Sequence, residues 1–266
     1  ETSNFHRKTL LEQGQTDFTK GNNGLNTHEL SLLYCYYYFQ MHFSSTVAVL
    51  RELRELLIRE IFNESNKILF VDVGCGPFTS GIAFLYFMRL AEKINKKKSG
   101  SWISNLSLEY CGIDTAKSLI LTGKNIYNEY CNETGDNKLS YSNIKVAYTS
   151  DNLTKLVGNS DKNSPIILNC CYLFASQSLD IDAFSSEVRR LINNNPDRKI
   201  LLIYQNAPTA RVKVTRNYND FVSQTSDMIK DRTAVEDLKF SFIDELKSSA
   251  NKSFTKKVRY NIIKYY

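Results

Sequence analysis

The sequence is short of the residues from which metal centres and disulfide frameworks are built. It contains only three histidines, His6, His28 and His42, and they share no metal-ligand spacing. None of its six cysteines forms a Cys-x-x-Cys pair, and most lie in apolar segments, where cysteine usually behaves as a small buried hydrophobe. We therefore expect no metal site and no disulfides, and we predict a cytoplasmic protein.

Long apolar runs and several catalytic motifs are also missing. No run approaches the ~20 apolar residues that a membrane-spanning helix needs, so we expect no membrane association. The phosphate-binding P-loop, the His-Glu-x-x-His zinc motif and the Gly-x-Ser-x-Gly nucleophile elbow are absent. The first residues include neither a methionine nor an apolar signal core, so we expect the chain to begin inside a longer product.

What remains is the composition of a globular protein with a mildly basic balance. Of the 266 residues, 42% are hydrophobic and 23% are charged, which suits one large α/β domain. The net charge is +6, and clustered basic residues suit an anionic partner such as RNA, with a solvated surface as the alternative. The clusters are Lys96-Lys97-Lys98, Arg189-Arg190, Arg198-Lys199, Arg211/Lys213/Arg216 and Lys256-Lys257/Arg259.

Apolar runs alternate with amphipathic segments along most of the chain. The runs predict strands at about 67–73, 106–113, 143–148, 164–171 and 199–205. The intervening segments predict helices at about 79–98, 115–131, 151–158, 180–194 and 217–231. This alternation indicates βαβ units and a mostly parallel, doubly wound sheet.

Both ends of the chain differ from this pattern. Apolar spacing predicts one helix over 28–42 and a second that starts at the cap signal Ser44-Ser45-Thr46 and runs to about 62. Near the other end, apolar and polar residues alternate around Phe240 and Tyr260, which predicts a final antiparallel hairpin. We therefore divide the chain into an N-terminal arm and helical extension, 1–62, and an α/β domain, 63–266.

The segment from Lys67 to Gly81 predicts a buried strand, a tight glycine turn and a helix, the local structure of a nucleotide-cofactor site. The strand ends at Asp72, two residues before Gly74-Cys-Gly76. A dinucleotide fingerprint needs a third glycine where this chain has Thr79, and the carboxylate would repel a pyrophosphate. A nicotinamide-dependent oxidoreductase is therefore a disfavoured alternative.

The run Asp72-Val-Gly74-Cys-Gly76 resembles the first motif of class I S-adenosylmethionine-dependent methyltransferases, acid-x-Gly-x-Gly-x-Gly, with Phe78 in place of the last glycine. The resemblance covers residues from about 67 to 266. It implies a seven-stranded Rossmann-like sheet with the last strand inserted antiparallel, and S-adenosylmethionine as the cofactor. It also implies cofactor contacts along the turn, from Asp72, Gly74, Cys75, Gly76 and Pro77.

Ligands bind beyond the carboxyl ends of the strands in such sheets, so the next strand ends supply further candidates. Asp114, with Thr115 beside it, follows the second strand and can accept two hydrogen bonds from a ribose diol. By the resemblance, the residues after the third strand face the adenine amino group. These candidates are Ser150, Asp151 and Asn152.

The fourth and fifth strands supply candidates for catalysis and substrate binding. Asn169-Cys-Cys-Tyr172 resembles the Asn-Pro-Pro-Tyr motif of amino methyltransferases without its prolines. This makes Asn169 and Tyr172 catalytic candidates, Asn169 also a cofactor ligand and Tyr172 also a substrate contact. Polar groups after the fifth strand could meet a phosphate or carboxylate of the substrate, namely Gln205, Asn206 and Arg211.

These observations predict methyl transfer from S-adenosylmethionine to an unidentified acceptor, with RNA or a ribonucleoprotein slightly favoured over a small molecule or protein. The alternative is a catalytically silent methyltransferase fold that serves as a binding module, and a Phe78 side chain that enters the cofactor site would support it. The tyrosines at 34–38 predict either a lid over the cofactor or part of the core. The N-terminal helices are also a candidate surface for a protein partner.

Overall fold

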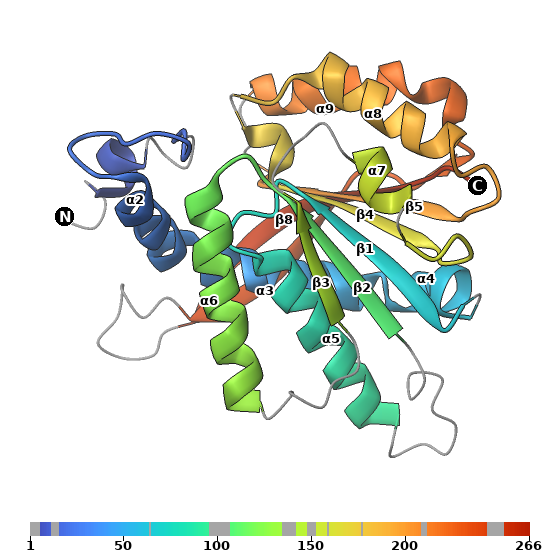
Figure 1. Cartoon of the computed structure of the whole chain (residues 1–266), viewed down its shortest axis with the longest axis horizontal. Coiled ribbons are helices and arrows are strands. Elements are labelled where there is room, and N and C mark those ends of the chain that lie inside the picture. Colours follow the sequence, from blue (N-terminus) through green and yellow to red (C-terminus); the bar gives the residue numbers. More distant parts are fainter. Residues whose placement is uncertain are drawn as a thin grey trace.

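A sheet of eight strands forms the centre of the molecule (Figure 1). The structure is a computed structural model that describes residues 6–11, 16–63, 65–95, 107–134, 142–147, 153–158, 160–176, 178–208, 212–243 and 253–266. The strand order is β3-β2-β1-β4-β5-β8-β6, and β7 also pairs with β8. All the elements below lie within the described ranges.

Five of these strands are parallel and coincide with the five predicted apolar runs. They are β1 (Lys67–Val73), β2 (Ser107–Ile113), β3 (Ser142–Ala147), β4 (Ile166–Cys171) and β5 (Ile200–Asn206). The strand β1 lies between β2 and β4, so that Asp72 is level with Gly112 on one side and Asn169 on the other. The carboxyl ends of these strands meet at one edge of the sheet, where the predicted site residues gather.

The remaining strands are antiparallel and complete the sheet. The twelve-residue β8 (Ser253–Lys264) pairs with β5 on one side. On its other side it pairs with the short β6 (Asp231–Arg232) and with β7 (Glu236–Ile243). The last strand is thus inserted antiparallel beside β5, which confirms the predicted class I methyltransferase fold. The sheet has eight strands rather than the expected seven because the two-residue β6 also pairs with β8.

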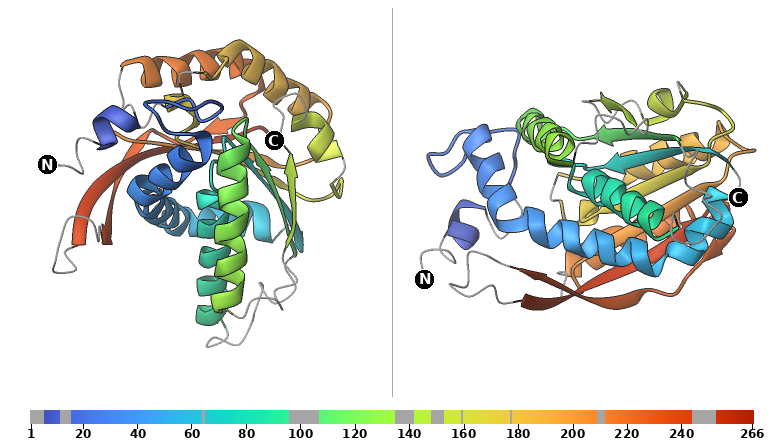
Figure 2. Two further views of the ribbon diagram at one scale, coloured as in Figure 1. Left: turned by 60° about the vertical axis from the view of Figure 1, so that its left-hand side comes forward. Right: turned by 90° about the horizontal axis from the view of Figure 1, so that it is seen from below.

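Helices cover both faces of the sheet and enclose two apolar clusters (Figures 1 and 2). One face is covered by α5 (Thr79–Asn95) and α6 (Lys117–Thr134), and the other by α7 (Leu153–Gly158), α8 (Ile181–Asn193) and α9 (Val212–Gln224). The helix α9 ends before the predicted position near 231, because the main chain pairs with β8 from Lys230 onward. Single helical turns lie at Leu173–Ala175 and Ser226–Met228.

A nearly unbroken helical rod precedes the sheet. It consists of α2 (Thr27–Tyr34), a π-helical turn (Cys35–Phe39) and α3 (Gln40–Glu52), followed by α4 (Arg54–Leu57) and a further π-helical turn (Ile58–Phe62). The predicted helix start at Ser44-Ser45-Thr46 is wrong. The hydroxyl of Ser45 donates to the carbonyl of His42 within the helix, and that of Thr46 lies 3.5 Å from Cys171 Sγ, so neither caps a helix.

This rod packs between α5 and the hairpin of β7 and β8 (Figure 2, right). Val49 and Leu50 of α3 are buried in the same apolar cluster as Phe84 of α5 and Phe240 of β7. The predicted domain boundary at residue 62 separates the helical rod from the sheet. The two parts nevertheless share one apolar core.

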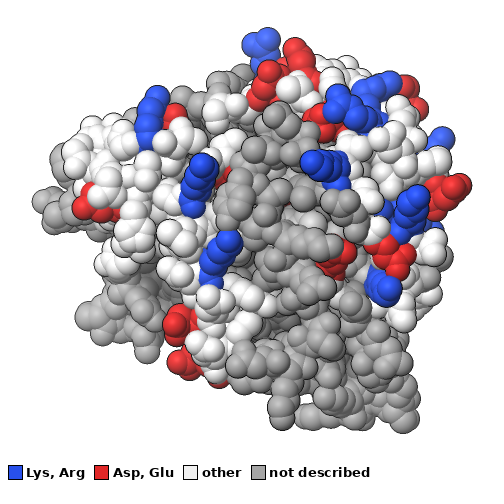
Figure 3. Space-filling model, in the orientation of Figure 1, with Lys and Arg blue, Asp and Glu red and all other residues white. Residues whose placement is uncertain are grey.

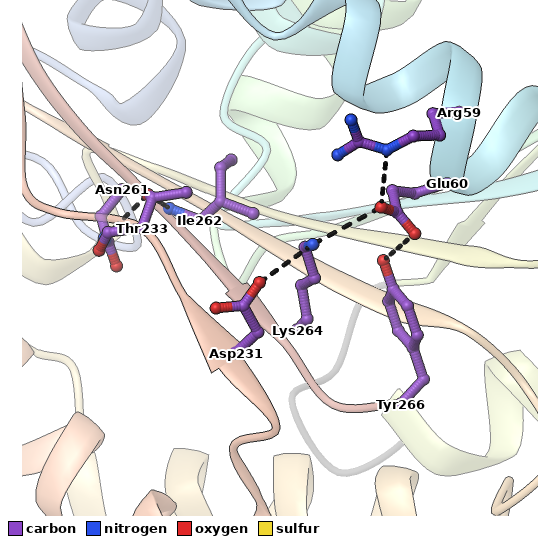
Figure 4. A network of polar contacts seen from close by, with 8 residues as sticks. All are labelled: Arg59, Glu60, Asp231, Thr233, Asn261, Ile262, Lys264 and Tyr266. Carbon is purple, nitrogen blue, oxygen red and sulfur yellow. Dashed lines mark hydrogen bonds and ion pairs between the residues drawn. The ribbon is translucent and has the colours of Figure 1, made fainter.

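Polar contacts join the end of β8 to the last turn of the helical rod and to β6 (Figure 4). Glu60 accepts hydrogen bonds from Arg59 (3.0 Å) and from the hydroxyl of Tyr266 (3.3 Å). Lys264 Nζ lies 3.6 Å from a Glu60 oxygen and 3.0 Å from one of Asp231. These contacts hold the last strand against both the helical rod and β6.

Candidate functional site

The glycine turn between β1 and α5 is shaped by three residues with positive φ. These are Gly74 (φ 68°), Gly76 (φ 51°) and Phe78 (φ 60°). The amides of Gly74 and Cys75 donate to the carbonyl of Ile113, at 2.8 and 3.0 Å. A Cβ at Gly76 would meet no atom within 4 Å, and both glycines line a cavity. The turn therefore presents bare backbone to the cavity.

Phe78, which stands where the methyltransferase motif has its last glycine, turns away from this cavity. Its side chain is 2% exposed and lies in the apolar cluster beneath α5. The ring makes an edge contact with Tyr110, with 5.7 Å between the ring centroids. Phe78 is not among the residues that line the cavity. Its backbone thus adopts the glycine-like conformation while its side chain fills the core.

Asp114, at the end of β2, holds the turn from the side of the second strand. One carboxylate oxygen accepts from the amide of Gly76 and the other from that of Ala116, both at 2.8 Å. Burial raises the pKa of Asp114 despite these bonds, and no ion pair to it occurs within the described part of the chain. Asp114 and Thr115 both line the cavity.

Asp72 lies beneath the cavity rather than in its wall. It is 1% exposed, and its two oxygens accept from the hydroxyl of Tyr110 (2.8 Å) and the amide of Asn169 (2.7 Å). The side-chain amide of Gln205 donates to Asn169 in turn, at 3.3 Å. Three predicted site residues thus form one buried chain of hydrogen bonds, and none of the three lines the cavity. Cys75 and Pro77 do not line it either.

The buried position of Asp72 predicts a pH-dependent stability. Desolvation raises its pKa to about 7 from an ordinary value of 3.8, against the effect of the hydrogen bonds from Asn169 and Tyr110. Between pH 4 and 7 the folded protein therefore keeps a proton that the unfolded chain has lost, and the free energy of unfolding falls as the pH rises. We expect this loss to be on the order of 3 kcal/mol.

Urea denaturation at several pH values across this range checks the prediction, with Asp72→Asn as the comparison. The asparagine keeps the shape of the side chain but does not titrate, so the difference in unfolding free energy between the two proteins should change between pH 4 and 7. Parallel profiles would show that Asp72 ionises normally.

A cavity of about 1060 Å³ lies over the carboxyl ends of the parallel strands. Its floor includes the glycine turn and Asp114, and residues 16–22 of the N-terminal arm form part of its rim. The arm is attached to α6, where the hydroxyl of Ser118 donates to the carbonyl of Phe18 (3.4 Å). Asn206, a predicted substrate contact at the last position of β5, lines the cavity and accepts a hydrogen bond from the amide of Ala207 (2.8 Å).

One wall of the cavity is aromatic and includes a residue that the sequence did not indicate. Tyr172 follows β4 with φ 58°, and its ring stacks on His42 with 4.0 Å between centroids. The Tyr34 hydroxyl lies 3.1 Å from Nδ1 of His42, and Tyr38 also stacks on the imidazole. We call Tyr34, Tyr38, His42 and Tyr172 the aromatic wall, since all four line the cavity.

The aromatic wall carries no charge near neutral pH. Burial lowers the pKa of His42 to about 3 and raises the pKa of the Tyr34 hydroxyl far above its ordinary value. Within the predicted tyrosine segment, Tyr37 instead lies in a small apolar cluster with Leu11 and Leu30. The segment therefore contributes both to a core and to the cavity wall.

Several predicted residues fall outside the described ranges or away from the cavity. Ser150, Asp151, Asn152 and Arg211 lie outside the described residues. Among the described basic residues, Arg189 pairs with Asp227, Arg190 with Glu187, Arg216 with Asp220 and Arg259 with Asp237. In the face drawn in Figure 3, basic and acidic side chains are interspersed over its described part. These four arginines of the basic clusters therefore have acidic partners within the described part of the chain.

The part of the chain that the structure describes contains neither a metal-binding cluster nor a membrane-spanning helix. No group of three or more histidine, cysteine or acidic residues there could hold a metal ion. No helix there combines the length and apolar character that crossing a membrane requires.

Comparison with known proteins gives a similarity of fold. No protein-family model and no curated protein matches the sequence. A methyltransferase from Anabaena variabilis shares 11% identity over 86% of this chain and 93% of its own, with a TM-score of 0.44. The plantazolicin methyltransferase, solved with S-adenosylhomocysteine, shares 11% identity over 100% and 96%, with a TM-score of 0.41.

SCL7 of Oryza sativa, which is not named as a methyltransferase, shares 14% identity over 74% of this chain and 52% of its own, with a TM-score of 0.45. These similarities are weak, and they include proteins with and without that name. The strand order of the sheet, with β8 inserted antiparallel between β5 and β6, is what gives this chain the class I methyltransferase fold.

Proposed function

We propose that the protein binds S-adenosylmethionine and transfers its methyl group to an acceptor. The observation that carries the proposal is the glycine turn, open to a large cavity and held by the carboxylate of Asp114 at the neighbouring strand end. This is where an open α/β sheet binds a nucleotide cofactor.

The chemistry of the described residues fits this cofactor. Each oxygen of Asp114 accepts one amide hydrogen, and because a carboxylate has about four acceptor sites, both oxygens can still accept from a ribose diol. The floor of the cavity around the turn carries carboxylate and no described cation, which suits a sulfonium and disfavours a pyrophosphate. Gly76 leaves open space against the backbone for a close approach.

Roles for the remaining residues follow from where their side chains lie. Asp72, with Asn169 and Tyr110, would position the end of β1 and the start of the turn without touching the cofactor. When bound, S-adenosylmethionine supplies an electrophilic methyl group on a positively charged sulfur. The protein would then contribute alignment and the exclusion of water, the latter from the uncharged aromatic wall and the N-terminal arm.

The acceptor is the finer part of the proposal. RNA would require unpaired arginines or lysines near the cavity. The two described cations that line the cavity, Lys20 and Arg190, lie against Asp17 and Glu187, which favours a small acceptor over RNA. The alternative of a silent binding module has less support than the sequence indicated, because Phe78 leaves the cavity open.

Calorimetric titration of the full chain with S-adenosylmethionine and S-adenosylhomocysteine tests the cofactor, with NAD as the comparison. We expect binding of both sulfur compounds in the micromolar range and none of NAD. If neither S-adenosylmethionine nor S-adenosylhomocysteine binds at millimolar concentration, the proposal is overturned. Binding without methyl release to any acceptor fraction would favour the silent module.

A further inference from the structure

The aromatic wall lies beside the glycine turn and is contributed by two parts of the chain that are far apart in sequence. Tyr34, Tyr38 and His42 come from the helical rod, while Tyr172 follows β4. The Tyr172 hydroxyl donates to Ser45 of the same rod at 3.4 Å, which adds a polar contact to the ring stack on His42. The wall is therefore fixed from both sides.

The backbone of Tyr172 adopts a left-handed conformation that is unfavourable for a residue with a Cβ. A non-glycine residue in the left-handed region costs roughly 1 kcal/mol or more and persists only where surrounding contacts fix it. Here that conformation places a partly buried ring in the cavity wall at the end of β4. The ring is thus held next to the turn, where the proposed cofactor would present its methyl group.

The charges around the cavity disfavour an acceptor with phosphate groups. Of the described lining residues, only Lys20 and Arg190 are cationic. Lys20 lies 3.3 Å from Asp17, and Arg190 pairs with Glu187. Asp114 and Asp180 add two further carboxylates to the lining. A phosphate would meet paired cations and uncompensated negative charge, whereas an uncharged or cationic molecule would not.

The size of the cavity favours a small acceptor. Sites for small ligands usually measure about 300–1,000 Å³. At about 1060 Å³, this cavity has room for a nucleoside cofactor and a small second molecule. The arm at residues 16–22 closes part of its rim, with the Phe18 ring packed on Tyr34 at 5.2 Å. A polymer would have to displace that arm.

We infer that the methyl acceptor is a small, phosphate-free aromatic molecule whose ring packs against the aromatic wall. The inference rests on the proposed function. In the transfer, the hydroxyl oxygen or amine nitrogen of the acceptor forms a bond to the methyl carbon. The carbon–sulfur bond breaks with its electron pair moving to sulfur, and the proton of the acceptor passes to water.

Ligand-observed NMR on the full chain saturated with S-adenosylhomocysteine tests the inference with defined probes. The aromatic probes are phenol, catechol and tyramine, and the phosphate-bearing comparisons are AMP and total RNA. We expect at least one aromatic probe to bind and neither comparison to do so at the same concentration. Methyl transfer from labelled S-adenosylmethionine to the bound probe class is the second readout.

Three variants localise the binding. Tyr172→Ala should weaken the aromatic probe at least tenfold, whereas Tyr172→Phe, which keeps the ring, should stay within about threefold. Tyr36→Ala is the control, because Tyr36 is on the rod that carries the other three residues of the aromatic wall but is 60% exposed and does not line the cavity. Thermal unfolding of each variant identifies any loss of folding. If Tyr172→Ala does not fold, Tyr38→Leu takes its place, because Tyr38 is also in the aromatic wall and its loss should likewise weaken the aromatic probe.

The two proposals fail in different ways. Absence of S-adenosylhomocysteine binding overturns the proposed function itself. Normal binding of S-adenosylhomocysteine together with no aromatic probe bound, or with methylation of RNA or AMP, overturns the aromatic acceptor alone. Equal probe affinity in Tyr172→Ala and the wild type overturns the aromatic wall as its site.

Discussion

Asp114→Ala is expected to weaken the binding of S-adenosylhomocysteine about 100-fold or more. The variant loses the carboxylate proposed to accept the ribose diol, and hydrogen bonds to a charged group are worth about 1.5–3 kcal/mol each. Two such bonds amount to about 3 kcal/mol, which is about 100-fold in affinity. The amide of Gly76 also loses its partner, so the turn loses part of its support. Calorimetric titration measures the change.

Asp180→Ala provides the matched control. Asp180 is a second carboxylate in the cavity wall, but its side chain accepts from the amide of Ala183 and caps α8. Its loss should cost about 1 kcal/mol of folding stability and leave the affinity for S-adenosylhomocysteine within about threefold. Equal losses of affinity in the two variants would mean that Asp114 has no special role.

Phe78→Ala should destabilise the protein by about 3–5 kcal/mol, the usual cost of removing a buried aromatic ring. Phe78→Gly removes the same ring but relieves the positive φ, which is unfavourable for any residue with a Cβ. We therefore expect the glycine variant to be more stable than the alanine variant by about 1 kcal/mol. Urea denaturation of the two variants measures the difference directly.

Phe84 offers a control with the opposite expectation. It is fully buried and lies within α5, where the backbone is helical and glycine costs about 1 kcal/mol relative to alanine. Phe84→Gly should therefore be less stable than Phe84→Ala, the reverse of the order at Phe78. The same order at both positions would show that backbone conformation does not govern Phe78.

The fold could be predicted because the apolar runs and the alternating segments of the sequence coincide with its strands. The apolar runs mark β1 to β5, and the alternation around Phe240 and Tyr260 marks the antiparallel pair. The helix break before Ser45 was predicted wrongly because local propensity gives no account of a partner 125 residues away, the separation of Thr46 and Cys171. Such contacts exist only once the rod has packed on the sheet.

Positions at strand ends were easier to predict than the directions of their side chains. Side chains alternate between the two faces of a strand. Asp72 shares its face with Phe70, and Asn169 shares its face with Ile167, both of which lie in the apolar cluster beneath α5. The sequence shows which side chains of β1 and β4 share a face of the sheet. It does not show how much of that face the glycine turn and α5 cover. Asp114, beyond the end of β2, is only partly buried and lines the cavity.

His42 was missed for a related reason. His42 lies on the helical rod, some 25 residues before the first strand, and no recognisable motif surrounds it. The only available signal was its spacing from Tyr34 and Tyr38, which places the three residues on one helical face. An aromatic face on a helix can pack in a core or line a cavity. Here it lines the cavity together with Tyr172, whose ring stacks on His42.

The insertion of β8 constrains how this protein can be synthesised. All seven residues of β5 are buried, and one edge of that strand pairs only with β8, about 50 residues later in the chain. During translation the edge of β5 therefore stays unpaired until β8 has left the ribosome, and an apolar unpaired edge is a site of aggregation. Nascent chains halted before residue 253 should thus depend on chaperones in a way that the released protein does not.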